Sequence, residues 1–166
     1  MRSVARLVAI AMLAFAPASA EAADATGTLA VVASVSANCQ IATSANVDFG
    51  TYDTAVHLHD GPVDVTAQAV SIACTKDATG VSIALDQGEY ARGSHRGLGG
   101  GPGTATVAYD IYTSQQRSTV WNTINTVAYA PRTSRSVTIP LYGRIPAGQT
   151  VAPGRYSDVL LAMVNF

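Results

Sequence analysis

Cys39 and Cys74 are the residues of this 166-residue chain whose chemistry is easiest to assign. Two thiols this far apart in sequence do not resemble a zinc framework, which uses closely spaced ligand pairs. An even cysteine count in an exported chain is typical of a disulfide, and two free buried thiols are the alternative. Closing a loop of this length stabilises a fold by about 3–4 kcal/mol in the loop-entropy model. We therefore predict a Cys39–Cys74 disulfide that ties the start of the domain to its second strand.

Three other patterns resemble functional sites but lack a required part. His57 and His59 could place two imidazoles on one face of a strand, yet they lie in an expected surface loop without an identifiable third metal ligand. The run Gly97–Gly103 lacks the Gly-Lys-Ser/Thr ending of a phosphate loop and opens no helix. It is interpreted as a flexible loop that cannot be a buried element, because glycine offers no side chain to pack. Gly93-Ser94-His95 misses the Gly-x-Ser-x-Gly pattern of a nucleophile elbow.

Acidic and aromatic residues give no stronger indication of catalysis. Asp86 and Glu89 are close in sequence, but acidic pairs at a strand end are usually solvated, and a glycosidase needs a defined separation across a cleft. Trp121 and the tyrosines could line a sugar platform, although core packing is favoured. We expect no enzyme, no metal site and no cofactor.

The first twenty residues are typical of a signal peptide. Arg2 and Arg6 make a positive start, an apolar run follows from 7 to 16, and residues 18–20 offer a small-x-small cleavage site. The apolar run is shorter than the roughly 20 residues that cross a bilayer as a helix. We expect cleavage after Ala20, with a retained anchor as the alternative. The exported product is expected to make no direct membrane insertion.

Charge in the chain is low and mixed. There are ten basic and eleven acidic residues, and Lys76 is the only lysine. Because no basic cluster exists, neither a nucleic-acid partner nor electrostatic attachment to anionic lipid is supported. The length that remains after cleavage suits one domain with a hydrophobic core.

An alternating segment near the amino terminus organises the rest of the chain. From Leu29 to Ile41 every odd position is apolar or cysteine, and most even positions are polar. This alternation predicts a strand, because successive side chains leave a pleated backbone on opposite faces. The segment is long for a strand, whose usual length is about 5–6 residues. It is either two strands end to end or a strand that reaches beyond its own domain, and we favour the second.

Further strand-like segments follow to the end of the chain, separated by turn residues. They span 47–53, 63–75, 81–85, 105–113, 120–121, 136–142 and 156–166. Pro140 cannot donate a hydrogen bond to a sheet, so it implies a sheet edge or a β-bulge. No segment after the first twenty residues shows convincing helical periodicity. Short strands with Gly/Pro-rich turns predict an all-β sandwich in one domain.

Several short motifs occur in a distinctive order: Cys39, 47–52, 71–75, 109–112 and 120–121. The most specific ones lie in the carboxy-terminal third, at Tyr142, Gly143, Arg144, Ile145, Pro146, Gly148, Gln149, Gly154, Tyr156 and Asp158. With these motifs the chain resembles the spore coat protein U domain family, which includes the Csu-type pilins of archaic chaperone–usher systems. The resemblance covers essentially the whole mature chain.

The resemblance implies an immunoglobulin-like, pilin-type β-sandwich that is incomplete and is completed by a donor strand. It implies a periplasmic chaperone that first fills the gap, an outer-membrane usher, and neighbouring pilin subunits whose N-terminal extensions replace the chaperone. The corresponding domains are a cleaved signal peptide at 1–20, an extension that acts as donor strand at 21–37 and the sandwich at 38–166.

The two ends of the chain fit this mode of assembly. The last segment puts four side chains in one register as an acceptor-groove strand: Leu160, Ala162, Val164 and Phe166. Because the chain ends in mid-strand, a sheet edge there needs a partner. The spare segment before Cys39 offers four donor side chains to plug a groove between sheets: Leu29, Val31, Ala33 and Val35. The alternative is that this segment completes its own domain, which would give a monomer.

The expected function is therefore a structural subunit of a secreted surface fibre that supports adhesion and biofilm formation. Two alternatives keep the same fold: a carbohydrate-binding adhesin that uses its loops, and a non-polymerising secreted coat or matrix protein.

Overall fold

The structure is a computed structural model that describes residues 26–43 and 46–166. The expected signal peptide lies outside these residues. The chain divides after Ser34 into two units, and the second, from Val35 to Phe166, holds all the strands. Within the described ranges the regular elements are strands, and no helix is long and apolar enough to cross a membrane.

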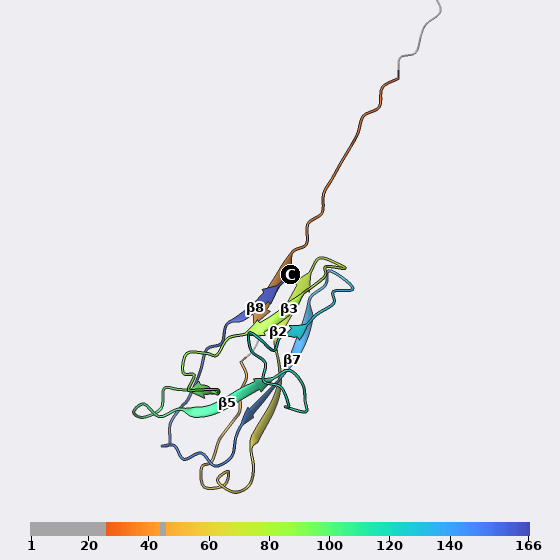
Figure 1. Ribbon diagram of the computed structural model, residues 1–166. Helices are drawn as coiled ribbons and strands as arrows, with labels where there is room; N and C mark the ends of the chain where they lie inside the picture. The colour runs from red at the N-terminus through yellow and green to blue at the C-terminus, as the bar shows by residue number, and fades with distance from the viewer. Residues whose placement is uncertain (1–25, 44–45) are drawn as a thin grey trace, which may run out of the picture. The chain divides into compact units, whose positions relative to one another are not determined.

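In the described part of the chain, eight strands form two antiparallel sheets (Figure 1). The five-stranded sheet has the order β1-β2-β7-β5-β4, and the three-stranded sheet has the order β6-β3-β8. The strands are β1 (Cys39–Thr43), β2 (Val63–Cys74), β3 (Ser82–Leu85), β4 (Arg96–Leu98), β5 (Val107–Tyr112), β6 (Val127–Ala128), β7 (Val137–Ile145) and β8 (Ala162–Asn165). The expected all-β fold is confirmed.

The core lies between the two sheets and follows from the alternation within the strands. In β2 the apolar residues Val70, Ile72 and Cys74 are buried. The alternate residues Ser71 and Ala73 are only partly buried. Apolar side chains from both sheets and from a loop meet there: Ile72, Ile83, Ile111, Trp121, Leu141 and Ile145. Trp121 is fully buried. For this residue the prediction of core packing is confirmed, and the alternative of a sugar-binding platform is wrong.

Pro140 lies in β7, an interior strand of the five-stranded sheet. The register of β2 against β7 shifts between Ala67, which pairs with Leu141, and Val70, which pairs with Ile139. Two residues of β2 therefore stand opposite the single Pro140, which is the geometry of a β-bulge. The bulge lies where the missing N–H of proline would interrupt the ladder. Of the two expected explanations for Pro140, a sheet edge or a β-bulge, the structure confirms the β-bulge.

The expected strand at 47–53 is wrong. This segment is a loop, because the side chains of Asp48 and Asp53 accept hydrogen bonds from the backbone N–H groups of Gly50 and Ala55, each at 2.8 Å. Such local bonds compete with sheet pairing. The loop still contributes to packing, since the ring of Phe49 meets that of Tyr109 edge to face at 5.7 Å.

Two further expectations need correction. The glycine-rich run was expected to stay out of buried elements, but β4 lies partly within it and both Gly97 and Gly99 are buried. Glycine is required there because a Cβ at position 97 would collide with the backbone of Tyr90. The expected strand 156–166 is also shorter than its pattern: β8 begins only at Ala162.

Candidate functional site

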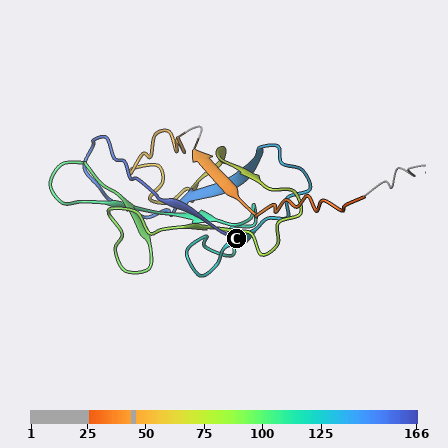
Figure 2. The same ribbon diagram turned by 90° about the horizontal axis from the view of Figure 1, so that it is seen from above.

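The candidate site is a gap in strand pairing between β1 and β8. β1 is an edge of the five-stranded sheet and pairs with β2, and β8 is an edge of the three-stranded sheet and pairs with β3. The two edges lie side by side, as Figures 1 and 2 show, but no ladder joins them within the described residues. Each edge therefore presents backbone N–H and C=O groups that a further strand could bind.

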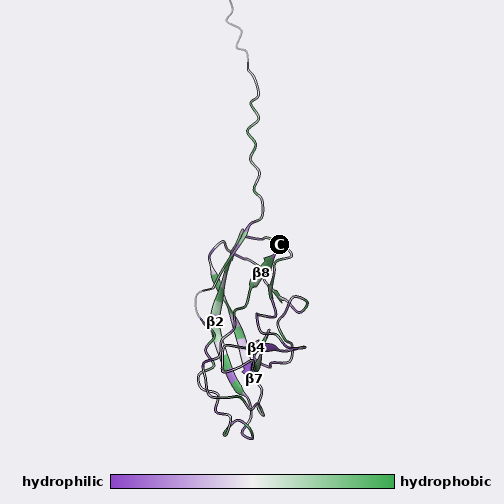
Figure 3. Ribbon diagram, turned by 90° about the vertical axis from the view of Figure 1, so that its left-hand side faces the viewer, coloured by the Kyte–Doolittle hydropathy of each residue, from purple (hydrophilic) through white to green (hydrophobic). Residues whose placement is uncertain are grey.

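Apolar side chains that face the core line this gap, which we call the open seam and define by Cys39, Ile41, Leu160, Ala162 and Val164. All five pack against the core cluster, yet each is only half-buried. The hydrophobic colouring of β8 is visible in Figure 3. Phe166 lies just beyond β8 and is 55% exposed. The structure thus brings together three of the four residues expected in the acceptor strand and leaves the fourth at its margin.

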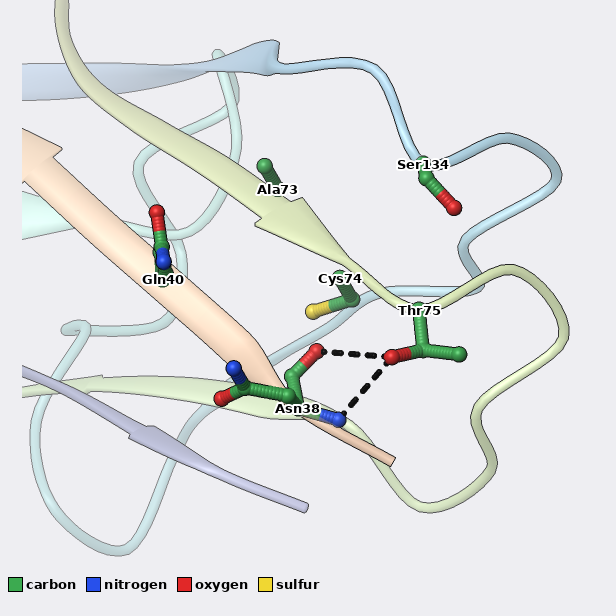
Figure 4. A pocket seen from close by; sticks show the side chains of 6 residues that line it. All are labelled: Asn38, Gln40, Ala73, Cys74, Thr75 and Ser134. Carbon is green, nitrogen blue, oxygen red and sulfur yellow. Dashed lines mark hydrogen bonds between the residues drawn. The ribbon is translucent and has the colours of Figure 1, made fainter. Parts of the chain in front are cut away.

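The start of β1 is fixed by a disulfide and by hydrogen bonds, of which Figure 4 shows those between Asn38 and the side chain of Thr75. The Cys39–Cys74 disulfide is confirmed, and the two cysteines are also direct partners across the β1–β2 ladder. The carbonyl of Asn38 accepts the backbone N–H of Thr75 at 2.8 Å, and the N–H of Asn38 donates to Oγ1 of Thr75 at 3.0 Å. These bonds hold the point at which the N-terminal segment enters the domain.

The expected donor residues precede that point. Residues 26–38 form neither strand nor helix, and the strand character of the alternating pattern is realised only from Cys39 onward. Leu29, Val31 and Val35 are 88%, 87% and 88% exposed, and Ala33 is exposed as well. Burying such exposed apolar side chains against a partner would lower the free energy of the complex.

The other edge of the five-stranded sheet, at β4, is joined to the segment that leads into β8, and we call this joint the closed seam: Arg96, Gly99, Tyr109, Ser157 and Asp158. Gly99 and Ser157 exchange two backbone hydrogen bonds of 2.8 Å each. The hydroxyl of Tyr109 donates to Asp158 at 2.8 Å. Burial and this contact with a carboxylate raise the pKa of Tyr109, so the phenol stays protonated and remains a donor.

Arg96 completes the closed seam from inside. Its side chain is 1% exposed and donates to the carbonyls of Asp86 (Nε, 3.0 Å) and Trp121 (Nη2, 2.7 Å). Burial lowers the pKa of Arg96, but from so high a starting value that the group stays charged. The indole N–H of Trp121 in turn donates to the carbonyl of Ile83 at 2.8 Å. One guanidinium therefore links the segments around β3, β4 and Trp121.

The motif residues that carried the family resemblance have structural contacts. The amide of Gln149 bonds both backbone groups of Ala108, at 2.6 Å and 2.9 Å. In the β5–β7 register Ala108 falls opposite Pro146, which has no N–H to give. Gln149 therefore acts as a substitute for a strand neighbour. The backbone N–H of Gln149 donates to the hydroxyl of Tyr52 at 3.1 Å. The preceding Gly148 has a φ of +82°, a conformation that favours glycine and suits a turn.

The remaining motif residues pack or pair. Arg144 forms two hydrogen bonds with Asp64, at 2.7 Å and 2.8 Å, and these lower the pKa of the Asp64 carboxyl. Gly143 allows close packing, since a Cβ there would collide with Phe49 and Val65. The others occupy the core, the sheet or the turns beside the closed seam: Ile145 is buried, Tyr142 pairs with Thr66 and Tyr112, and Tyr156 and Gly154 lie against Gly101 and Pro102.

The residues considered for catalysis or metal binding, among them His57 and Asp86, make structural contacts. His57 stacks on Tyr52 at 5.2 Å, and the described residues contain no group of three His, Cys, Asp or Glu side chains able to hold a metal ion. Oδ1 of Asp86 accepts the backbone N–H groups of Gly88 and Leu161, which ties the segment before β8 to the end of β3. Asp86 therefore has a structural role that its sequence position beside Glu89 did not indicate.

Comparison with known proteins identifies the family of this chain. A model of the Spore Coat Protein U domain matches residues 25–163. The chain belongs to this family. Protein U of Myxococcus xanthus is 36% identical over 169 residues, which cover 95% of this chain and 93% of that protein. The resemblance inferred from the motifs is confirmed for this domain family.

Solved structures give the fold. The P pilus rod subunit PapA matches 76% of this chain and 97% of its own, with a TM-score of 0.51 and 17% sequence identity. A CsuC–CsuE chaperone–tip adhesion subunit pre-assembly complex of Acinetobacter baumannii matches 80% of this chain with a TM-score of 0.49 and 16% identity, and this chain spans 40% of that chain. The match to PapA shows that the chain has the expected immunoglobulin-like, pilin-type fold.

Sequence reasoning missed the closed seam. Arg96 lies beside a glycine run without hydrophobic alternation, and its partners are carbonyl groups of distant segments, which carry no side-chain signal. Leu160, Ala162 and Val164 of the open seam were predicted from the alternation of period two at the end of the chain, whereas Cys39 and Ile41 were not predicted to line it.

Proposed function

We propose that this protein is a subunit of a secreted surface fibre, assembled by donor-strand exchange, in which the open seam of one copy accepts residues 26–37 of the next. The observation that carries the proposal is the pair of adjacent, unjoined edges, β1 and β8, lined by half-buried apolar side chains. A strand added there would bond to both edges and cover those side chains, which is recognition by β-strand addition.

The chain carries a segment of the matching type. Leu29, Val31, Ala33 and Val35 alternate with polar residues and are exposed. Burying the three larger side chains contributes roughly 5–8 kcal/mol before the cost of ordering the segment. As in the family resemblance, a periplasmic chaperone fills the seam first and an outer-membrane usher directs the exchange. Adhesion and biofilm formation follow as roles of the assembled fibre.

Charge placed on the donor face tests the proposal. The double variant Leu29→Asp/Val31→Asp should fold with a chaperone but fail to extend fibres, because carboxylates cannot enter an apolar groove. Ser34→Asp/Ser36→Asp is the matched control, since it adds the same charge to the opposite face. Unboiled native material on a denaturing gel should give a ladder for the wild type and the control, since an inserted strand leaves slowly. Normal ladders from the Leu29/Val31 variant would overturn the proposal.

A second candidate, a non-polymerising coat or matrix protein, is favoured by the family match to the Spore Coat Protein U domain. It predicts that wild-type protein runs as a monomer without boiling, and that a peptide of residues 26–38 does not bind to the folded domain.

A further inference from the structure

Two loops at opposite ends of the sandwich carry different charge. β2 and β7 run side by side between these ends, with Val63 paired to Ile145 at one and Ile72 paired to Val137 at the other. The length of β2 sets the ends about 36 Å apart at a rise of about 3.3 Å per residue. Both ends belong to the unit that starts at Val35.

One end, which we call the acidic end, is the loop before β2 with exposed Asp48, Asp53 and Asp60. The sequence has no lysine or arginine between Arg6 and Lys76, so this loop has neither, whereas exposed Arg92 and Arg155 lie on other segments that reach the same end. The loop is fixed in place, because the N–H of Gly148 donates to the carbonyl of His57 at 3.0 Å. Arg144 and Arg117, on neighbouring segments, both engage Asp64.

The other end, which we call the basic end, comprises Lys76, Asp77, Arg132 and Arg135, all of them exposed. Two hydrogen bonds hold its two loops together: the N–H of Lys76 to Oγ of Ser134 at 3.2 Å and the N–H of Asp77 to the carbonyl of Pro131 at 2.8 Å. Lys76 pairs with Asp77, whereas the guanidinium groups of Arg132 and Arg135 make no hydrogen bond or ion pair with the described part of the chain. Two cationic side chains are therefore available to a partner.

We propose that in the fibre the basic end of one copy docks on the acidic end of the next copy. The inference rests on the proposed function, because donor-strand exchange brings successive copies into contact end to end. Complementary charge at the rim of such an interface raises the association rate and selects orientation more than it raises affinity.

The charges also select the direction of the inserted strand. The donor segment joins its own domain at Cys39, which lies at the basic end because it pairs with Cys74. β8 runs toward the basic end, since Asn165 pairs with Ser82 at the start of β3. A donor antiparallel to β8 leaves the acceptor at the acidic end, so opposite charges meet. A donor parallel to β8 leaves it at the basic end, where like charges meet. The proposal therefore requires the antiparallel insertion.

Single charge reversals in the secreted full chain test the contact. Assembly is followed by light scattering for the wild type, Arg132→Glu, Asp60→Lys and the combination of both, which has the net charge of the wild type. Arg155→Glu controls for net charge: it changes net charge as Arg132→Glu does but lies before β8, toward the acidic end, so it should not slow assembly. Each of the other single reversals should slow assembly about threefold or more at low salt, and the combination should recover most of the rate. The differences should vanish near 1 M salt, where screening acts within about 3 Å.

A labelled peptide of residues 26–38 separates this proposal from the one on which it rests. The peptide carries the donor strand without the basic end, so it should bind to wild type and Arg132→Glu equally. If it fails to bind to either, the proposed function is wrong. If it binds and the wild type polymerises, but Arg132→Glu assembles at the rate of the wild type or the combination recovers nothing, the docking of the two ends is overturned.

Discussion

The two margins of the sandwich differ in how the sheets meet. At the closed seam, backbone bonds between Gly99 and Ser157 join the end of β4 to the segment before β8, and Tyr109, Asp158 and Arg96 add side-chain bonds around them. At the open seam, β1 and β8 lie next to each other without a ladder, and their core-facing side chains stay half-exposed. The closed seam is joined by bonds within the chain, whereas the open seam leaves two strand edges unjoined and apolar side chains half-exposed.

The difference between the closed and open seams indicates where a further strand can bind. Buried hydrogen bonds are costly to break, because each group left behind loses its partner in a low-dielectric interior. A strand is therefore not expected to enter at the closed seam. At the open seam a strand would add bonds without breaking any, so the fold itself directs a partner to one side.

Truncating Trp121, whose carbonyl accepts a hydrogen bond from Arg96 beside the closed seam, or Leu160 of the open seam gives the largest expected effect. Trp121→Ala should lower the free energy of unfolding by about 3–5 kcal/mol, through the cavity and the loss of its bond to Ile83. Leu160→Ala, at the half-buried margin, should cost about 1–2 kcal/mol. Urea unfolding of the isolated domain measures both. Equal losses would contradict the distinction between the seams.

The sequence predicted the two margins unequally. The disulfide, the bulge at Pro140 and the alternation of Leu160, Ala162 and Val164 follow from local rules on pairing, proline and period. The burial of Arg96 depends on carbonyl groups that only the folded chain brings together. The segment 47–53 was misjudged because its aspartates bond their own backbone, which alternation does not reveal.

Removing the disulfide should destabilise the whole domain and loosen the open seam most. Cys39→Ala/Cys74→Ala should lower the free energy of unfolding by about 3–4 kcal/mol, because the loop between the cysteines becomes unrestrained in the unfolded state. Since the bridge also anchors β1, amide exchange should quicken more in β1 than at Gly99 and Ser157. Thermal unfolding and hydrogen exchange check both parts. An equal increase at Gly99 would show that the seams are not independent.

The smallest effect is expected at Asp64, which belongs to neither seam. Arg144 lowers its pKa in the folded chain, so the pair stabilises the fold above the unfolded-state pKa, and this contribution is lost as pH falls through the lower, folded-state value. The pair is partly exposed and contributes less than about 1 kcal/mol. Below about pH 4 the melting temperatures of wild type and Asp64→Asn should therefore converge. A gap that widens on acidification would contradict this assignment.

Hydrogen exchange of β1 and β8, compared between the isolated chain and assembled fibres, tests the central claim most directly. The account predicts fast exchange of the edge amides in the isolated chain and strong protection in the fibre, with the closed seam protected in both. Edge amides that are already protected in the isolated chain would show that the open seam is filled by the chain itself, and the fibre model would fail.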